Sequence, residues 1–124
     1  MTCPVMDLYL LEYDSLFTKD QESEEHIKTL THALHTHGIV GIRGVPQYPE
    51  QLKALIRAAK TFSALDEHIK LRYALFDEDA EKDSYCAEIP ENPNNRWPAE
   101  FDLRTPYLEL STLIMETGKK LLNF

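Results

Sequence analysis

Cysteine is scarce in this chain of 124 residues, which contains two, Cys3 and Cys86, far apart and in unrelated contexts. Small secreted domains that depend on disulfides carry several cysteines at regular spacings, whereas proteins of reducing compartments usually keep theirs as thiols. We therefore expect two free thiols, not a disulfide between Cys3 and Cys86, and a cytoplasmic location.

Long apolar runs and an excess of basic residues are also missing. No stretch approaches the roughly 20 apolar residues of a membrane-spanning helix, and the first residues lack the basic and apolar regions of a secretory signal. The net charge is -8, and no basic stripe carries interleaved aromatic residues. We expect no membrane and no nucleic-acid partner, and we interpret the acidity as a solvated surface.

Glycine is used sparingly, and the first of the four glycines follows a helical pattern. Ile27, Leu30 and Leu34 are spaced three and four residues apart, which places them on one face of a helix. Gly38 comes next and can take the left-handed conformation that ends a helix. The apolar run at residues 39–42 is short and rich in β-branched side chains, so it predicts a strand buried on both faces.

Two more helices are expected after this strand. Pro49 fits the first turn of the next helix, because a missing N–H group costs nothing there. The apolar face of that helix consists of Leu52, Leu55, Ile56, Ala59 and Phe62. Asp66 is expected to be the N-cap of a shorter helix. That helix would carry Ile69, Tyr73 and Phe76.

The segment before these elements is expected to contain a strand at residues 5–10, with Pro4 at its start, and an acidic loop at residues 12–23. No further strand is predicted anywhere in the chain. A sheet of two strands is marginal alone. We therefore expect both strands to contribute to a larger sheet that this chain does not contain.

The C-terminal part begins with a charged run at residues 77–83, which is typical of a solvated loop or helix end. Residues 84–104 contain three prolines and predict a long connection without regular structure, and such loops are often functional. Trp97, the only tryptophan, is expected to anchor this loop by packing, with ligand contact as the alternative. Thr105 and Pro106 predict the cap and first turn of a last helix that continues to the final residue. That helix is apolar on more than one side.

The histidines are the main candidates for metal ligands. His32 and His35 are one helical turn apart, with His37 close by, and imidazoles at such spacing can share a metal. No cysteine or carboxylate completes this set, so exposed polar positions are the simpler interpretation and a small metal-binding protein is a rival. An Fe(II) site of two histidines and one carboxylate needs a His-x-Asp or His-x-Glu pair. None of the five histidines has an acidic residue two positions on, so no catalytic, cofactor-binding or metal-binding residue is predicted.

Several segments, in this order and spacing, together resemble the N-terminal region of the isopenicillin N synthase-like oxygenases. They are Pro-Val-Met-Asp-Leu at 4–8, His-Gly-Ile-Val-Gly-Ile-Arg-Gly-Val at 37–45, Phe-Ser-Ala-Leu-Asp-Glu-His-Ile-Lys at 62–70, Asn-Asn-Arg-Trp-Pro at 94–98, and the last helix. Two features depart from the family pattern. Ile39 and Val40 stand where aromatic residues are usual, and Ser84 precedes Tyr85 where a glycine is common.

The resemblance implies an α+β fold, namely a mainly helical N-terminal domain of about four helices over residues 1–124. Its two short strands would join a jelly-roll (double-stranded β-helix) core, which is absent from this chain. The family depends on Fe(II) and mostly on 2-oxoglutarate, and the resemblance implies that both are held by that core. It also implies that a loop with Tyr85 and Trp97 lies on the substrate side.

We therefore expect a structural or substrate-lid segment of an Fe(II)- and 2-oxoglutarate-dependent oxygenase, which is inactive by itself. Its partner would be the C-terminal jelly-roll domain of the same protein. The alternative is a stand-alone module derived from such an oxygenase, which binds another protein or a second copy through its exposed apolar strands and last helix.

Overall fold

The structure is a computed structural model that describes residues 7–18, 20–77, 82–85 and 87–124, with the backbone alone at 75–77 and 82–84. The described part contains five helices and four short strands. It forms two compact units. The first comprises residues up to Pro46 together with Phe124, and the second comprises residues 47–123. The mainly helical character is therefore confirmed, with five helices where about four were expected and four strands where two were expected.

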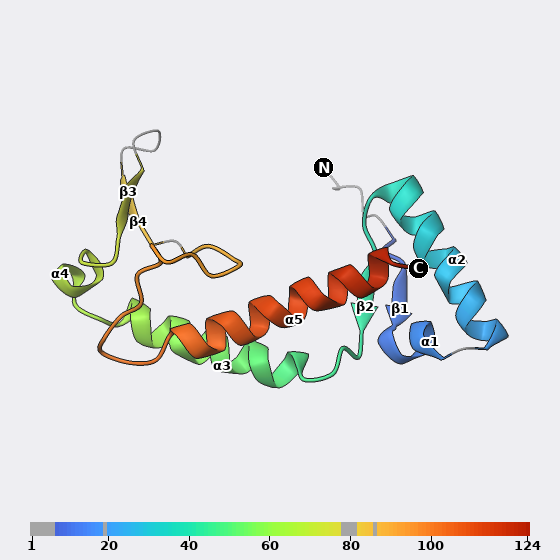
Figure 1. Ribbon diagram of the computed structural model, residues 1–124, viewed down its shortest axis with the longest axis horizontal. Coiled ribbons are helices and arrows are strands. Elements are labelled where there is room, and N and C mark those ends of the chain that lie inside the picture. Colours follow the sequence, from blue (N-terminus) through green and yellow to red (C-terminus); the bar gives the residue numbers. More distant parts are fainter. Residues whose placement is uncertain (1–6, 19, 78–81, 86) are drawn as a thin grey trace, which may run out of the picture. The chain divides into compact units, whose positions relative to one another are not determined.

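The first unit is built on two parallel strands. Its elements, in chain order, are β1 (Leu10–Glu12), α1 (Tyr13–Phe17), α2 (Gln21–His37) and β2 (Gly41–Arg43). Leu10 pairs with Gly41 and Glu12 with Arg43. A tight turn cannot join parallel neighbours, because the chain must first return to the start of the sheet. The helices α1 and α2 provide this return (Figure 1).

The long helix α2 has a defined stop at each end. Asp20 caps its start, since its Oδ1 accepts a hydrogen bond from the backbone N–H of Ser23 at 2.8 Å. At the other end Gly38 has a φ of 71°, and its N–H donates to the carbonyl oxygen of Leu34 at 3.0 Å. The predicted helix and its glycine stop are confirmed.

Side chains alternate between the two faces of β1 and the residues before it. Leu11 is 6% exposed and belongs to the core of this unit with Leu16, Leu30 and Ala33. Tyr9, two residues earlier on the same face, lies against His32 and His37 of α2, with ring centroids 6.0 and 5.8 Å apart. This face of the strand is therefore turned toward the helices.

The opposite face of the pair, which we call the outer sheet face, consists of Leu8 and Leu10 lying over Gly41. A Cβ atom at Gly41 would run into the Leu10 side chain and come within 3.2 Å of Leu8. Leu8 is 42% exposed and Leu10 50% exposed. Parallel sheets normally have both faces covered, whereas the first unit by itself leaves Leu8 and Leu10 on this face largely exposed.

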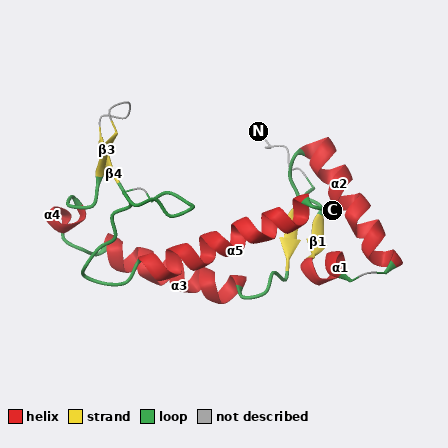
Figure 2. Cartoon of the chain, viewed as in Figure 1, coloured by secondary structure: helices red, strands yellow, loops and turns green. Residues whose placement is uncertain are grey.

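The second unit contains three helices and a hairpin, which are coloured by secondary structure in Figure 2. Its elements are α3 (Tyr48–Ser63), α4 (Glu67–Lys70), β3 (Leu75–Asp77), β4 (Lys82–Ser84) and α5 (Arg104–Leu122). The two long helices α3 and α5 pack against each other, and Pro49 lies in the first turn of α3 as predicted. Ala58 of α3 and Leu110 of α5 are buried, whereas Ile114 of α5 remains 54% exposed.

The loop predicted at residues 12–23 is wrong in part, because α1 occupies residues 13–17. Tyr13 and Phe17 are one turn apart, and their rings pack at an angle of 45° with centroids 4.6 Å apart. Leu16 is only 1% exposed, and its carbonyl oxygen accepts a hydrogen bond from the Ser23 hydroxyl at 3.0 Å. The segment was predicted as a loop because most of its residues are polar or acidic, and its few apolar residues lie within too short a stretch to show a helical period.

The predicted helix that would carry Tyr73 and Phe76 is also wrong beyond α4. The chain leaves α4 through turns at residues 71–73, and residues 75–77 pair with residues 82–84 as an antiparallel hairpin. Part of the run expected as a loop is therefore strand. Residues far along the chain hold this segment: Arg96 Nη1 donates to the carbonyl oxygen of Ala74 at 3.0 Å, and the Tyr73 hydroxyl donates to Glu100 at 2.8 Å.

The two predicted strands are displaced along the chain. The first was expected at residues 5–10, of which 5 and 6 lie outside the described residues, and pairing begins only at Leu10. The second was expected at residues 39–42 and is found at Gly41–Arg43. Only three residues of each strand are paired with the other strand. The apolar run at residues 39–42 therefore begins before the paired part of β2.

We predict that replacing Gly38 with alanine lowers the free energy of unfolding by about 1–2 kcal/mol, the usual penalty for a side chain in the left-handed region. A Cβ atom there would meet nothing within 4 Å, so the effect is conformational and not steric. Gly38→Asn should cost less, because asparagine tolerates this region better. Urea denaturation followed by circular dichroism measures each change.

The matched control is Gly118→Ala in α5, where an added Cβ also meets nothing within 4 Å and the backbone is not left-handed. It should raise stability by about 0.5–1 kcal/mol, because alanine favours helix over glycine. Equal stability of the wild type and Gly38→Ala would contradict the left-handed end of α2.

A second prediction concerns the two faces of β1. Leu11→Ala should lower the free energy of unfolding by about 2–5 kcal/mol, as for other buried leucines. Leu10→Ala, which differs only in facing outward, should change it by less than about 1 kcal/mol. The same denaturation experiment measures both variants, and equal losses would show that the assignment of the faces is wrong.

Candidate functional site

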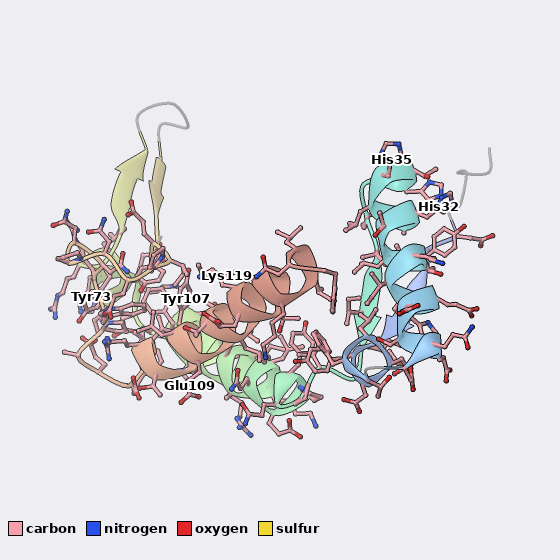
Figure 3. The ribbon with its side chains drawn as sticks, turned by 45° about the vertical axis from the view of Figure 1, so that its right-hand side comes forward. His32, His35, Tyr73, Tyr107, Glu109 and Lys119 are labelled. Carbon is pink, nitrogen blue, oxygen red and sulfur yellow. The ribbon has the colours of Figure 1, made fainter. Side chains whose placement is uncertain are left out.

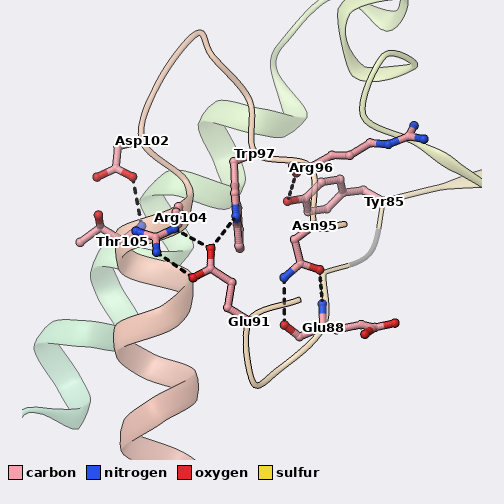
Figure 4. A network of polar contacts seen from close by, with 9 residues as sticks. All are labelled: Tyr85, Glu88, Glu91, Asn95, Arg96, Trp97, Asp102, Arg104 and Thr105. Carbon is pink, nitrogen blue, oxygen red and sulfur yellow. Dashed lines mark hydrogen bonds and ion pairs between the residues drawn. The ribbon is translucent and has the colours of Figure 1, made fainter. Parts of the chain in front are cut away.

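The long connection of the second unit is organised around Glu91 (Figure 4). Its Oε1 and Oε2 accept hydrogen bonds from Nε and Nη2 of Arg104, both at 2.7 Å. Trp97 Nε1 also donates to Glu91 Oε1, at 3.2 Å. The Trp97 ring lies edge-on to Tyr107 of α5, with centroids 5.5 Å apart. We call these four residues the Glu91 cluster, and it fixes the loop to the first turn of α5.

Side chains also satisfy the backbone of the loop where no strand or helix does so. The Asn95 side chain makes two hydrogen bonds to the backbone of Glu88. Its Oδ1 accepts from the Glu88 N–H at 2.9 Å, and its Nδ2 donates to the Glu88 carbonyl oxygen at 3.0 Å. The Tyr85 hydroxyl donates to the carbonyl oxygen of Arg96 at 2.9 Å, and its ring lies 4.9 Å from that of Phe62. Such pairing keeps an irregular segment in one conformation.

The start of α5 differs from the prediction. Thr105 was expected to cap this helix, but the side chain that accepts a hydrogen bond is that of Asp102, whose Oδ1 lies 3.0 Å from the backbone N of Thr105. That backbone hydrogen bond is the main reason why the pKa of Asp102 is lowered. A carboxylate at this position also suits the helix dipole.

The charges of the Glu91 cluster reinforce each other. The hydrogen bonds from Arg104 lower the pKa of Glu91, partial desolvation opposes this, and the Trp97 N–H adds to the lowering. Glu91 in turn raises the pKa of Arg104. Glu91 is therefore ionised near neutral pH and is a poor proton donor there. The arrangement positions the Trp97 ring and does not constitute an acid–base pair.

Both residues that the sequence placed on a substrate-side loop, Tyr85 and Trp97, lie in this connection. The structure gives each a packing partner: Phe62 for Tyr85 and Tyr107 for Trp97. The expected anchoring of the loop by Trp97 is therefore found, through its ring and its Nε1 atom. Contact of either residue with a substrate stays a prediction.

The histidines do not assemble into a metal site in the described part of the chain. His32 and His37 flank the Tyr9 ring, and Figure 3 shows His35 at the end of α2, apart from His32. Among the residues that the structure describes, no three His, Cys, Asp or Glu side chains are grouped to hold a metal ion. These residues therefore do not fit the two-histidine, one-carboxylate Fe(II) site.

Sequence reasoning missed Glu91, Arg104 and Asn95. Glu91 and Arg104 are separated by an irregular segment, in which no helical or strand period relates the two positions. For Asn95 a general indication existed, because asparagines in proline-rich loops often bond the backbone. The partner of such a side chain cannot be read from composition.

Two grooves border α5 within the second unit. One, of about 440 Å³, lies between the start of α3 and α5, and it is lined by Gln47, Gln51, Leu108, Glu109, Thr112, Leu113 and Glu116. The other, of about 350 Å³, is lined by Ile89, Pro90, Glu91, Leu108, Thr112, Met115, Glu116 and Lys119. The lining of each groove includes both apolar and charged side chains.

Comparison of the chain with models of known protein families, with curated proteins and with solved structures found no match. Within the described ranges, no helix has both the length and the apolar character needed to cross a membrane.

Acidification is predicted to release Trp97 from the Glu91 cluster. The pKa of Glu91 is lowered by folding, so its interactions stabilise the folded loop above the ordinary pKa of a glutamate, about 4.3. This contribution is lost as the pH falls through the lowered folded-state pKa. Trp97 is the only tryptophan, so its fluorescence emission should shift to the red in that acidic range and reverse on neutralisation.

The variant Glu91→Gln tests whether Glu91 is responsible for the acid transition of Trp97 fluorescence. This variant loses the charge but keeps the shape, so its emission should already be red-shifted at neutral pH and should lack the acid transition. Glu109→Gln is the matched control, because Glu109 lies outside the cluster on α5; it should behave as the wild type. A wild-type spectrum and titration in Glu91→Gln would contradict the role given to Glu91.

Proposed function

We propose that this chain is a non-catalytic N-terminal segment of an isopenicillin N synthase-like oxygenase that depends on Fe(II) and 2-oxoglutarate. In this proposal it packs against the jelly-roll core and forms part of the roof of the active site. The observation that carries the proposal is the parallel β1–β2 pair, whose outer sheet face is not covered by other parts of the first unit.

The pairing of β1 with β2 supports the proposal that further strands lie beside them in the complete protein. Two strands seldom form a stable sheet alone, and parallel strands occur almost only where both faces are covered. Here one face is turned toward α1 and α2, while Leu8 and Leu10 on the other are 42% and 50% exposed. A jelly-roll sheet beside this pair would supply both the missing strands and the missing cover.

The last helix supports the same proposal. Leu110 of α5 is 5% exposed, but Ile114 is 54% and Leu122 is 77% exposed. Leu110 and Ile114 are four residues apart and share one side of the helix, and the apolar stripe of a helix in a complete domain usually faces the core. In the family that the sequence resembles, the corresponding long helix packs on the jelly-roll core, which would cover these side chains.

The proposal assigns iron and 2-oxoglutarate to the core and neither to this chain. The part assigned to this chain is a loop of fixed shape, with Trp97 held by Glu91 and Tyr107, and Tyr85 held by Phe62 and the carbonyl oxygen of Arg96. Such a loop would present its aromatic residues to a substrate without rearranging.

The test has two parts. The chain of 124 residues, incubated with Fe(II) and 2-oxoglutarate, should show no 2-oxoglutarate turnover and no stoichiometric iron binding. The coding sequence beyond codon 124 should continue in frame into a His-x-Asp or His-x-Glu pair, a distal histidine and an arginine suited to a carboxylate.

Turnover by the 124 residues alone would overturn the non-catalytic role. A stop codon directly after codon 124 would overturn the link to a core in the same chain. If that stop were accompanied by concentration-dependent self-association in sedimentation experiments, the stand-alone binding module would replace the proposed lid.

A further inference from the structure

We draw no further inference here: the strongest candidate, the groove of about 440 Å³ between the start of α3 and the middle of α5, combines leucine side chains with the carboxylates of Glu109 and Glu116, and nothing in the structure shows what covers or fills it.

Discussion

The parallel register of β1 and β2 determines how the first unit is built. Because the strands run in the same direction, the chain between them has to return along the sheet, and α1 and α2 are that return. The same register buries Leu11 and leaves Leu10 about half exposed. Within the first unit, one apolar face of this parallel pair therefore has no cover, and the proposed packing against a further core depends on this property.

In the second unit the comparable constraint is the bidentate pair of Glu91 and Arg104. It joins an irregular, proline-rich segment to the first turn of α5 and gives Trp97 Nε1 its acceptor. The pair is partly exposed to solvent, so its contribution to stability is modest. Its planar, two-point geometry nevertheless favours one arrangement of the loop, and the proposed role of the loop beside a substrate depends on such an arrangement.

Local patterns predicted the parts of the fold that depend on neighbours in sequence. Examples are the helix α2 with its Gly38 stop and the proline in the first turn of α3. The predicted apolar face of α2 is right at Leu30 but wrong at Leu34, which is exposed while Ala33 is buried. Local patterns failed where distant residues decide, as at Ala74, whose carbonyl oxygen is held by Arg96 and whose segment becomes strand instead of helix. The Glu91 cluster belongs to this second group. The short turn of α1 and the hydrogen bond from the Thr105 N–H to Asp102 were both missed, because neither is marked by a periodic pattern in the sequence.

The most direct test of the central claim is amide hydrogen exchange in the chain of 124 residues. If β1 and β2 are part of a sheet that needs a further cover, the amides of Leu10–Glu12 and Gly41–Arg43 should exchange much faster than those around Leu30 and Ala33 in the buried face of α2. Equal and strong protection of the strands and of α2 would show that the β1–β2 pair is stable without a further cover. That result would contradict the claim that the pair packs against a further core.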